Sequence, residues 1–541
     1  MTSLLPRLAD YRSLRTTWRG DLLAGLTVGI VALPLALAFG VSSGVGAEVG
    51  LVTAVVAGLV AAVFGGSNVQ VSGPTGAMVV VLGPIVVSHG PGVVGLVAVM
   101  AGLVVVIGGV LRLGRLVSVI PWPVVEGFTL GIAVIIFLQQ VPAAIGAVPG
   151  ASSNAAVAAV QSIAGASWPG ALWPLATVAV VAAVIVLAPR VHKQLPGSII
   201  GIVLVTLVAV LAGLPVARIG ALPAALPLPA VPAFDLGTLG SLVAPALTVA
   251  ALAAIESLLS ARVAASLADT GAYDPDRELV GQGLASIASG FFGGMPATGA
   301  IARTAVNVRS GGRSRLAAIV HSLVLLGTIY LATTVVSQIP LAALSGVLMV
   351  TAVRMVSVAT VRSVVGSTRS DAVVFIVTAI ITVSFDLIIA VGIGIAVATY
   401  FALRTLASSG GVHREELPGA SVAGDERIAL FRLEGALFFG AAERVLERVS
   451  AIDDVTVVIL RMSQLQVLDA TGARVISEIV TGLERRGITV LIKGIQPRHA
   501  QLASRVGITT ALRHEKHLFT ELDAAVAHAR DHVVRAAATT A

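Results

Sequence analysis

The sequence predicts an α-helical membrane protein with fourteen transmembrane segments, followed by a small cytoplasmic α/β domain. Hydrophobic residues make up 56% of the 541 residues and charged residues only 12%, whereas soluble proteins carry about 25% charged residues. Apolar runs near the roughly 20 residues that cross a bilayer dominate as far as about residue 407. Beyond about residue 411 the chain becomes charged and alternates short apolar runs with amphipathic segments.

The apolar runs define the expected membrane segments. They cover approximately 21–41, 48–66, 74–88, 93–111, 122–141, 171–189, 197–214, 242–266, 278–294, 299–310, 314–337, 340–357, 371–386 and 387–407. Segments 74–88 and 299–310 are too short to span a bilayer. The last two runs are separated only at Ser384, Phe385 and Asp386, which we interpret as a tight outer turn.

The charges support this count and predict the orientation. With fourteen crossings, the basic loop residues fall on the side of the N-terminus: Arg112, Arg115, Arg190, Lys193, Arg309, Arg313, Arg315, Arg354, Arg362 and Arg369. Segment 142–170, on the opposite side, has no charged residue. This positive-inside pattern predicts a multi-pass protein of the cell (inner) membrane with both termini cytoplasmic. It also explains the net charge of +7 without nucleic acid as a partner.

Other classes are disfavoured by composition. The basic N-terminus precedes an apolar run with no cleavage site, which predicts a first transmembrane helix and not a signal peptide. The chain has no cysteine, and its nine histidines are scattered without ligand spacing. We therefore expect no metal site, no cofactor and no zinc enzyme.

The domain organisation follows from these changes in composition. We expect a cytoplasmic N-terminus at 1–20, a membrane domain at 21–407 with repeats at 21–214 and 242–407, a linker at 408–425, an α/β domain at 426–530 and a tail at 531–541. Runs 455–460 and 488–492 are typical of buried strands. Segments 440–449 and 471–486 are typical of the helices between strands. The Ala- and Arg-rich tail is typical of a frayed end.

An internal repeat indicates a binding site. The two short segments are third in each half of seven and begin alike, with Gly73-Pro74-Thr75-Gly76-Ala77-Met78 in one and Pro296-Ala297-Thr298-Gly299-Ala300-Ile301 in the other. An odd number of helices per half gives the halves inverted topology, and matched interruptions mark a transporter's binding site. Half-helices that begin inside the membrane point N–H groups and positive dipole ends at an anion. Gly76 and Gly299 let the ion approach the backbone; alternatively, Gly and Pro are simply common in membrane helices.

Two charges stand out within the predicted membrane segments, Arg303 and Glu256. Arg303, about one turn into the tenth segment, costs at least ~2.5–3.5 kcal/mol unless it is paired or hydrated, and a bound anion would offset this cost. Alternatively, it extends to the cytoplasmic face as Arg309 does. Glu256 lies in mid-span with Ser260 one turn further on. It could carry a proton or help to bind Na⁺, or it could be a structural partner of Arg262 or Arg303.

At these residues the chain resembles the SulP family, the sulfate-permease or solute-carrier-26 group of anion transporters. The resemblance covers nearly the whole chain. It rests on segments 20–27, 73–76 and 256–260, on Gly293-Gly294-Met295-Pro296-Ala297-Thr298-Gly299-Ala300-Ile301-Ala302-Arg303-Thr304-Ala305-Val306-Asn307, and on Leu468-Asp469-Ala470-Thr471-Gly472 in a C-terminal domain that resembles a STAS domain.

The resemblance implies seven plus seven inverted helices that form a core and a gate domain, with elevator-like alternating access and homodimers. The anion would bind between the third and tenth half-helices, where Phe39, Thr75, Ala300, Ile301 and Arg303 fall on substrate-site positions. Glu256 and Ser260 fall on positions that bind Na⁺ in the family's bicarbonate transporters.

Some residues depart from the family pattern. Pro34 is followed by Leu35, whereas many relatives carry glutamine at this position. In this respect the chain resembles the bicarbonate-type branch. That branch has aspartate at Glu256 and a hydroxyl residue at Ile301, so a Na⁺ site here would lack an oxygen ligand. Proton coupling through Glu256 therefore becomes at least as plausible as Na⁺ coupling. Thr471 occupies a position that is phosphorylated in some STAS relatives, or it is a helix-start hydroxyl.

The sequence thus predicts a secondary active transporter of a small inorganic or carboxylate anion, with sulfate or bicarbonate as the first expectation and H⁺ or Na⁺ as the coupling ion. A C4-dicarboxylate proton symporter and an uncoupled anion channel are alternatives. A voltage-driven motor of this fold would not need the coupling carboxylate Glu256. A nucleobase permease of the same fold would need neither Arg303 nor a STAS domain.

Overall fold

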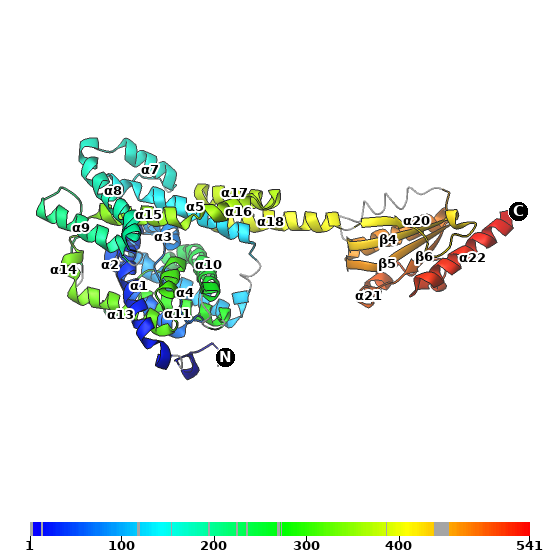
Figure 1. Cartoon of the computed structure of the whole chain (residues 1–541), viewed down its shortest axis with the longest axis horizontal. Helices are drawn as coiled ribbons and strands as arrows, with labels where there is room; N and C mark the ends of the chain where they lie inside the picture. The colour runs from blue at the N-terminus through cyan, green and yellow to red at the C-terminus, as the bar shows by residue number, and fades with distance from the viewer. Residues whose placement is uncertain are drawn as a thin grey trace. The chain divides into compact units, whose positions relative to one another are not determined.

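The structure is a computed structural model that describes residues 4–11, 14–115, 120–152, 154–192, 195–222, 225–233, 236–267, 271, 273–385, 387–409, 411–437 and 454–540. The chain divides into two compact units, Met1–Ala396 and Val397–Ala541, which are described separately (Figure 1).

The N-terminal unit is helical, and each of the fourteen predicted segments coincides with a helix. In order, these are α1 (Leu14–Ser42), α2 (Ala47–Phe64), α3 (Gly76–His89), α4 (Val94–Val110), α5 (Trp122–Gln139), α8 (Trp168–Val191), α9 (Gly197–Leu211), α10 (Leu236–Leu267), α11 (Pro275–Phe291), α12 (Ile301–Arg309), α13 (Arg315–Leu331) with α14 (Thr333–Val336), α15 (Leu341–Met355), α17 (Arg369–Ser384) and α18 (Leu387–Ser409), the last of which continues into the second unit. The break between the last two segments falls at Phe385, as predicted; Asp386 lies outside the described residues.

Three short helices were not predicted: α6 (Val141–Ala144), α7 (Ala155–Ala164) and α16 (Val358–Val365). Within the described residues, seven helices are long and apolar enough to cross a membrane by length and composition alone. Helices such as α9 and α13 are apolar but shorter. Where a helix is shorter than the bilayer is thick, non-helical backbone lies within the membrane depth, and neighbouring helices must bury it.

The helices pack in two groups. One group contains α1–α4 and α10–α13, and the other contains α5, α8, α9, α15 and α17. Small residues permit close packing in the first group. A Cβ added to Gly102 of α4 would lie 2.6 Å from the carbonyl oxygen of Gly283 in α11, and a Cβ on Gly283 would lie 2.6 Å from the carbonyl oxygen of Gly102. Such backbone-to-backbone contact is how membrane helices gain packing energy without a hydrophobic driving force.

The C-terminal unit contains a five-stranded sheet in the order β3-β4-β5-β6-β7, which runs Gly411–Glu415, Ile428–Leu437, Val457–Leu468, Thr489–Lys493 and Leu518–Phe519. β3 pairs antiparallel with β4, and the other pairs are parallel. Helices α20 (Ala470–Arg485) and α21 (Pro497–Val506) contribute to one apolar core, and α22 (Leu522–Thr540) contributes to a second. The predicted strands and the helix at 471–486 are present, whereas the helix expected at 440–449 lies outside the described residues.

Two expectations for this unit need correction. The segment expected as a linker contains β3, which pairs with β4. The tail expected to fray is instead part of α22, which extends to Thr540. Val526, Ala529 and Val533 recur at helical spacing, are buried and pack against the sheet, and this apolar stripe holds the helix in place.

Candidate functional site

The two short helices begin at one place because the segments before them pair. β1 (Ser72–Gly73) and β2 (Thr298–Gly299) form a two-stranded antiparallel sheet, in which Ser72 lies opposite Gly299 and Gly73 opposite Thr298. The Ala300 N–H also donates to the carbonyl oxygen of Val71 (2.9 Å). Segments more than two hundred positions apart in the sequence are therefore joined at the starts of α3 and α12.

Both helix starts leave backbone donors available. Thr75 and Ala300 are the N-caps of α3 and α12, and neither side chain accepts a capping hydrogen bond. The first turns of both helices therefore keep N–H groups without intrahelical partners, at the positive end of each helix dipole. Two such ends side by side form a site suited to an anion.

Glu256 lies directly at this site. The Thr75 hydroxyl donates to Glu256 Oε2 (2.8 Å), which links α10 to the start of α3. The next residue, Ser257, accepts a hydrogen bond from the Gly299 N–H (3.1 Å) and shares one with the Thr298 hydroxyl (3.0 Å). Helix α10 thus contacts both helix starts through consecutive polar residues.

Arg303 is buried, with 2% of its surface exposed, which disfavours the alternative that it extends to the cytoplasmic face. Its Nη2 donates to the carbonyl oxygen of Pro74, immediately before the other helix start. Its Nη1 is buried and has no hydrogen-bond partner among the described residues. A cation with an unused donor at this depth is unstable unless an anion or water completes it.

The remaining predicted site residues lie at different distances from this centre. Phe39 is buried on α1, and a Cβ added to Gly76 would lie 3.5 Å from its ring atom Cε1. Gly299 packs against Gln70 so closely that an added Cβ would overlap its amide. Ile301 is 42% exposed.

Ser260 is fully buried and shares a hydrogen bond with the Thr304 hydroxyl of α12 (3.3 Å), so it contacts a different helix from Glu256.

The alternative roles considered for Glu256 can also be compared with the geometry. In the described part of the chain no ion pair joins Glu256 to Arg262 or to Arg303, and the Glu256 carboxylate accepts a hydrogen bond from Thr75. The substrate and ion-coupling roles of all these residues stay predictions, but Thr75, Glu256 and Arg303 do lie at one place.

Sequence reasoning missed two buried carboxylates that support the site. Glu278 of α11 accepts four hydrogen bonds, from the N–H groups of Gly66 (2.7 Å) and Ser67 (3.0 Å) and from the amides of Gln70 (2.8 Å) and Gln282 (2.9 Å). It thereby holds the loop that leads into β1. The signal available in the sequence was an acidic residue followed by glutamine one turn later inside an apolar helix.

Asp21 is the second of these carboxylates. It is fully buried and accepts hydrogen bonds from the backbone N–H groups of Arg313 (2.7 Å) and Ser314 (3.0 Å) and from the hydroxyl of Thr17 (2.6 Å). It ties the start of α1 to the turn between α12 and α13, and so fixes the end of the second short helix. This gives a structural role to the acidic residue of segment 20–27.

A cavity of about 740 Å³ lies between the two helix groups. Its lining includes Leu35 of α1, Val306 and Arg309 of α12, and Thr351 and Arg354 of α15. Two arginines beside α1 and α12 make this a positively charged space adjoining the helices that carry the site.

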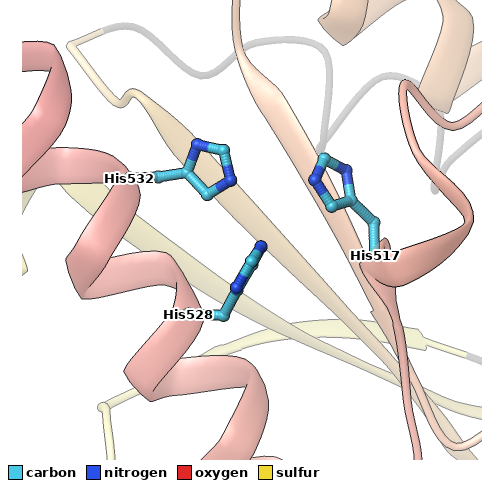
Figure 2. A group of neighbouring side chains, drawn as sticks. All are labelled: His517, His528 and His532. Atoms are coloured by element: carbon cyan, nitrogen blue, oxygen red, sulfur yellow. The ribbon is translucent and has the colours of Figure 1, made fainter.

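In Figure 2, His517, His528 and His532 of the C-terminal unit lie together, so the description of the histidines as scattered was wrong for these three. They lie outside the helical unit that carries the paired helix starts.

Comparison with known proteins supports a single class. The profile of the sulfate permease family matches residues 18–378, and that of the STAS domain matches residues 420–525. The putative sulfate transporter YvdB of Bacillus subtilis is 33% identical over 90% of this chain and 93% of its own length. The bicarbonate transporter BicA of Synechocystis is 31% identical over 88% of each chain.

Solved structures agree on the fold. The murine solute carrier 26 family member A9 anion transporter, in its inward-facing state, matches with a TM-score of 0.84 at 16% identity, over 98% of this chain and 94% of that one. The transmembrane domain of a cyanobacterial BicA matches with a TM-score of 0.62 at 31% identity, over 70% of this chain and 98% of that one.

The fold and the paired helix starts define a polytopic membrane transporter with a C-terminal STAS domain. The chain belongs to the sulfate permease family, which confirms the resemblance and the predicted fold class of inverted repeats. Its relatives are transporters, so the chain is not an enzyme of the zinc-dependent kind considered above.

Proposed function

We propose that this protein carries out secondary active transport of a small anion, with sulfate or bicarbonate as substrate, across the cell (inner) membrane. The observation that carries the proposal is the pairing of β1 with β2, which joins two uncapped helix starts beside Nη1 of Arg303, a donor without a partner among the described residues. Backbone donors from two helix starts and a fixed positive charge favour one oxyanion.

The substrate class rests on the chemistry of these donors and on the relatives. Backbone N–H groups and a guanidinium bind planar or tetrahedral oxyanions through their oxygens and discriminate little between them. The related proteins include those named as transporters of sulfate and of bicarbonate. A C4-dicarboxylate presents the same carboxylate oxygens and is the alternative substrate.

Proton coupling is supported by the environment of Glu256. Its carboxylate contacts the hydroxyl of Thr75 at the start of α3, so a change in its protonation alters the charge directly beside the anion. The partly exposed Ile301 offers no oxygen where a Na⁺ ion would need a ligand. These two residues favour H⁺ over Na⁺ as the coupling ion.

The proposed motion is of the elevator type. The anion site lies in the helix group that contains α3, α10 and α12, and the cavity lined by Arg309 and Arg354 lies between this group and the other. Movement of one group against the other would carry the site from this cavity to the opposite side. The charge pattern supports cytoplasmic termini as part of the proposal. The family resemblance supports a homodimer.

The test is uptake by purified protein in liposomes, with labelled sulfate, bicarbonate and fumarate supplied separately. Each anion is measured with a pH gradient, with a Na⁺ gradient and with neither. We expect saturable uptake of sulfate or bicarbonate that is accelerated by an inward proton gradient.

Three outcomes would change the proposal. Uptake that is linear in concentration and independent of both gradients would establish a channel. Uptake driven by Na⁺ alone would overturn proton coupling. Saturable uptake of fumarate, with neither inorganic anion transported, would establish the C4-dicarboxylate symporter.

A further inference from the structure

The C-terminal unit holds a cluster of three histidines that the transport function does not use. His517 lies at the end of η5 (Glu515–His517), immediately before β7, whereas His528 and His532 lie one turn apart on α22. Figure 2 shows their rings converging from these two elements. Histidines one turn apart lie on the same face of a helix, so both rings can reach one point in front of it.

The distances are those of a ligand set. One nitrogen from each ring lies within 4.8 Å of the other two, and the ring centroids are 4.9–5.6 Å apart. Tetrahedral zinc binds imidazole nitrogen at about 2.0–2.1 Å, which places any two ligand nitrogens about 3.4 Å apart. Small side-chain rotations would close the remaining difference.

A second observation is that the cluster is not satisfied by the protein. His517 is 2% exposed, and its Nδ1 is buried without a hydrogen-bond partner among the described residues. His528 Nε2 is in the same state. Buried ring nitrogens normally find a partner, so two orphaned nitrogens in one cluster indicate a missing ligand.

We propose that His517, His528 and His532 form a binding site for one divalent transition-metal ion, for which Zn²⁺ is the best fit. Imidazole nitrogen is a preferred ligand of Zn²⁺, whereas Mg²⁺ and Ca²⁺ require oxygen ligands that this cluster does not supply. Three histidines leave the fourth position of a tetrahedral ion to water.

The site would fasten α22 to the sheet. His517 is anchored beside β7, so a shared ion joins the helix to the sheet edge, in addition to the ion pair between Arg530 of α22 and Asp425 (2.8 Å). His528 and His532 lie beyond residues 420–525 that match the STAS domain profile. The site is therefore a property of this chain's own C-terminal helix and is independent of the proposed anion transport.

The test uses full-length protein, purified without a polyhistidine tag and stripped of metal with a chelator. Zn²⁺ is titrated against a chromophoric competitor, and Co²⁺ is added separately to record the visible absorption of a tetrahedral site. The variants are His528→Ala and His532→Ala, because alanine preserves the helix. His413→Ala, which removes a histidine of β3 outside the cluster, is the matched control.

We expect one Zn²⁺ per chain and a Co²⁺ spectrum in the unaltered protein and in His413→Ala. Each α22 variant should bind Zn²⁺ at least about tenfold more weakly, since even loss of an outer-shell partner costs 10- to 100-fold. Hydrogen exchange gives an independent measurement: Zn²⁺ should slow exchange of the α22 amides in the unaltered protein and not in the variants. Equal Zn²⁺ affinity in the unaltered protein and in both α22 variants, or no Zn²⁺-dependent protection of α22 in the unaltered protein, would overturn the proposal.

Discussion

Arg303 is the residue on which anion binding most directly depends. Its Nη2 donates to the Pro74 carbonyl oxygen, which fixes the guanidinium beside the α3 start, and its Nη1 has no partner in the part of the chain that the structure describes. We expect Arg303→Gln to weaken anion binding by about 10- to 150-fold, because a hydrogen bond to a charged group contributes about 1.5–3 kcal/mol. Equilibrium binding of labelled anion to detergent-solubilised protein measures this.

The control for this change is Arg309→Gln, at the end of the same helix and on the lining of the cavity. It removes an equal charge without touching the helix starts. Binding weakened equally by both variants would show that Arg303 contributes only to the general positive potential.

Glu256 is the residue on which coupling depends. Glu256→Gln keeps an oxygen that can accept the Thr75 hydroxyl but cannot take up a proton. We expect this variant to lose pH-driven uptake while still binding the anion, measured in liposomes and by equilibrium binding respectively. Glu126→Gln, at a carboxylate bonded to Trp122 on α5, is the matched control. Unchanged pH-driven uptake by Glu256→Gln would contradict proton coupling through this residue.

At the residue scale, positions could be predicted where the signal was local, while the roles of those residues stay predictions. Thr75, Ala300 and Arg303 could be placed because a repeated Thr-Gly-Ala motif and an intramembrane charge stand out against an apolar background. The bonds that Asp21 and Glu278 accept from backbone N–H groups could not, because those N–H groups, among them those of Arg313 and Gly66, are distant in the sequence. Every residue type except proline can offer such a donor, so the sequence carries no record of these backbone pairings.

The short helices are held together by close packing as well as by pairing. At Gly299 in β2, an added Cβ would lie 1.8 Å from Gln70 Nε2, and the same amide donates to Glu278 Oε1 (2.8 Å). We expect Gly299→Ala to destabilise the protein by about 1–3 kcal/mol, as overpacking does, and to weaken anion binding because the α12 start shifts. Thermal unfolding in detergent and the binding assay measure the two effects.

Gly327→Ala provides the comparison, because a Cβ there meets open space within α13. It should be neutral or slightly stabilising, since alanine is the better helix former. If Gly299→Ala were as stable as Gly327→Ala, the Gln70 side chain would move aside without a loss of stability, and the prediction would be wrong.

At the level of elements, the length of the apolar runs predicted the membrane helices but not the short helices beside them or the helix at the C-terminal end. The surface helices α7 and α16 were missed because each is too short to stand out by length from the adjoining apolar segments. The part of α22 from residue 531 onward was mistaken for a frayed tail because the apolar stripe of this helix is narrow and interrupted by charge. The cap of α20 is Asp469, whose Oδ1 accepts the Gly472 N–H (2.7 Å), and not the hydroxyl of Thr471.

At the level of the whole molecule, several long-range bonds support one common face for the basic loops. Asp21 joins the start of α1 to the turn before α13, Glu278 of α11 holds the loop after α2, and Asp276 accepts the Gly114 N–H (2.9 Å) after α4. These elements begin or end where the charge pattern predicts the cytoplasmic side. The pairing of β1 with β2 lies between the halves of the sequence, as inverted repeats require.

The predicted membrane orientation can be tested cleanly because the chain has no cysteine of its own. Single substitutions introduce one thiol at an exposed position: Ala151→Cys lies in the uncharged segment before α7, Ser363→Cys in α16 between basic residues, and Gln501→Cys in α21. In intact spheroplasts, a membrane-impermeant maleimide should label Ala151→Cys alone. After permeabilisation it should label all three, because the charge pattern predicts that the positive loops and the STAS domain face the cytoplasm. If Ser363→Cys alone were labelled before permeabilisation, the predicted orientation would be reversed. Equal labelling of Ala151→Cys and Ser363→Cys in sealed cells would contradict the predicted number of crossings between these two positions.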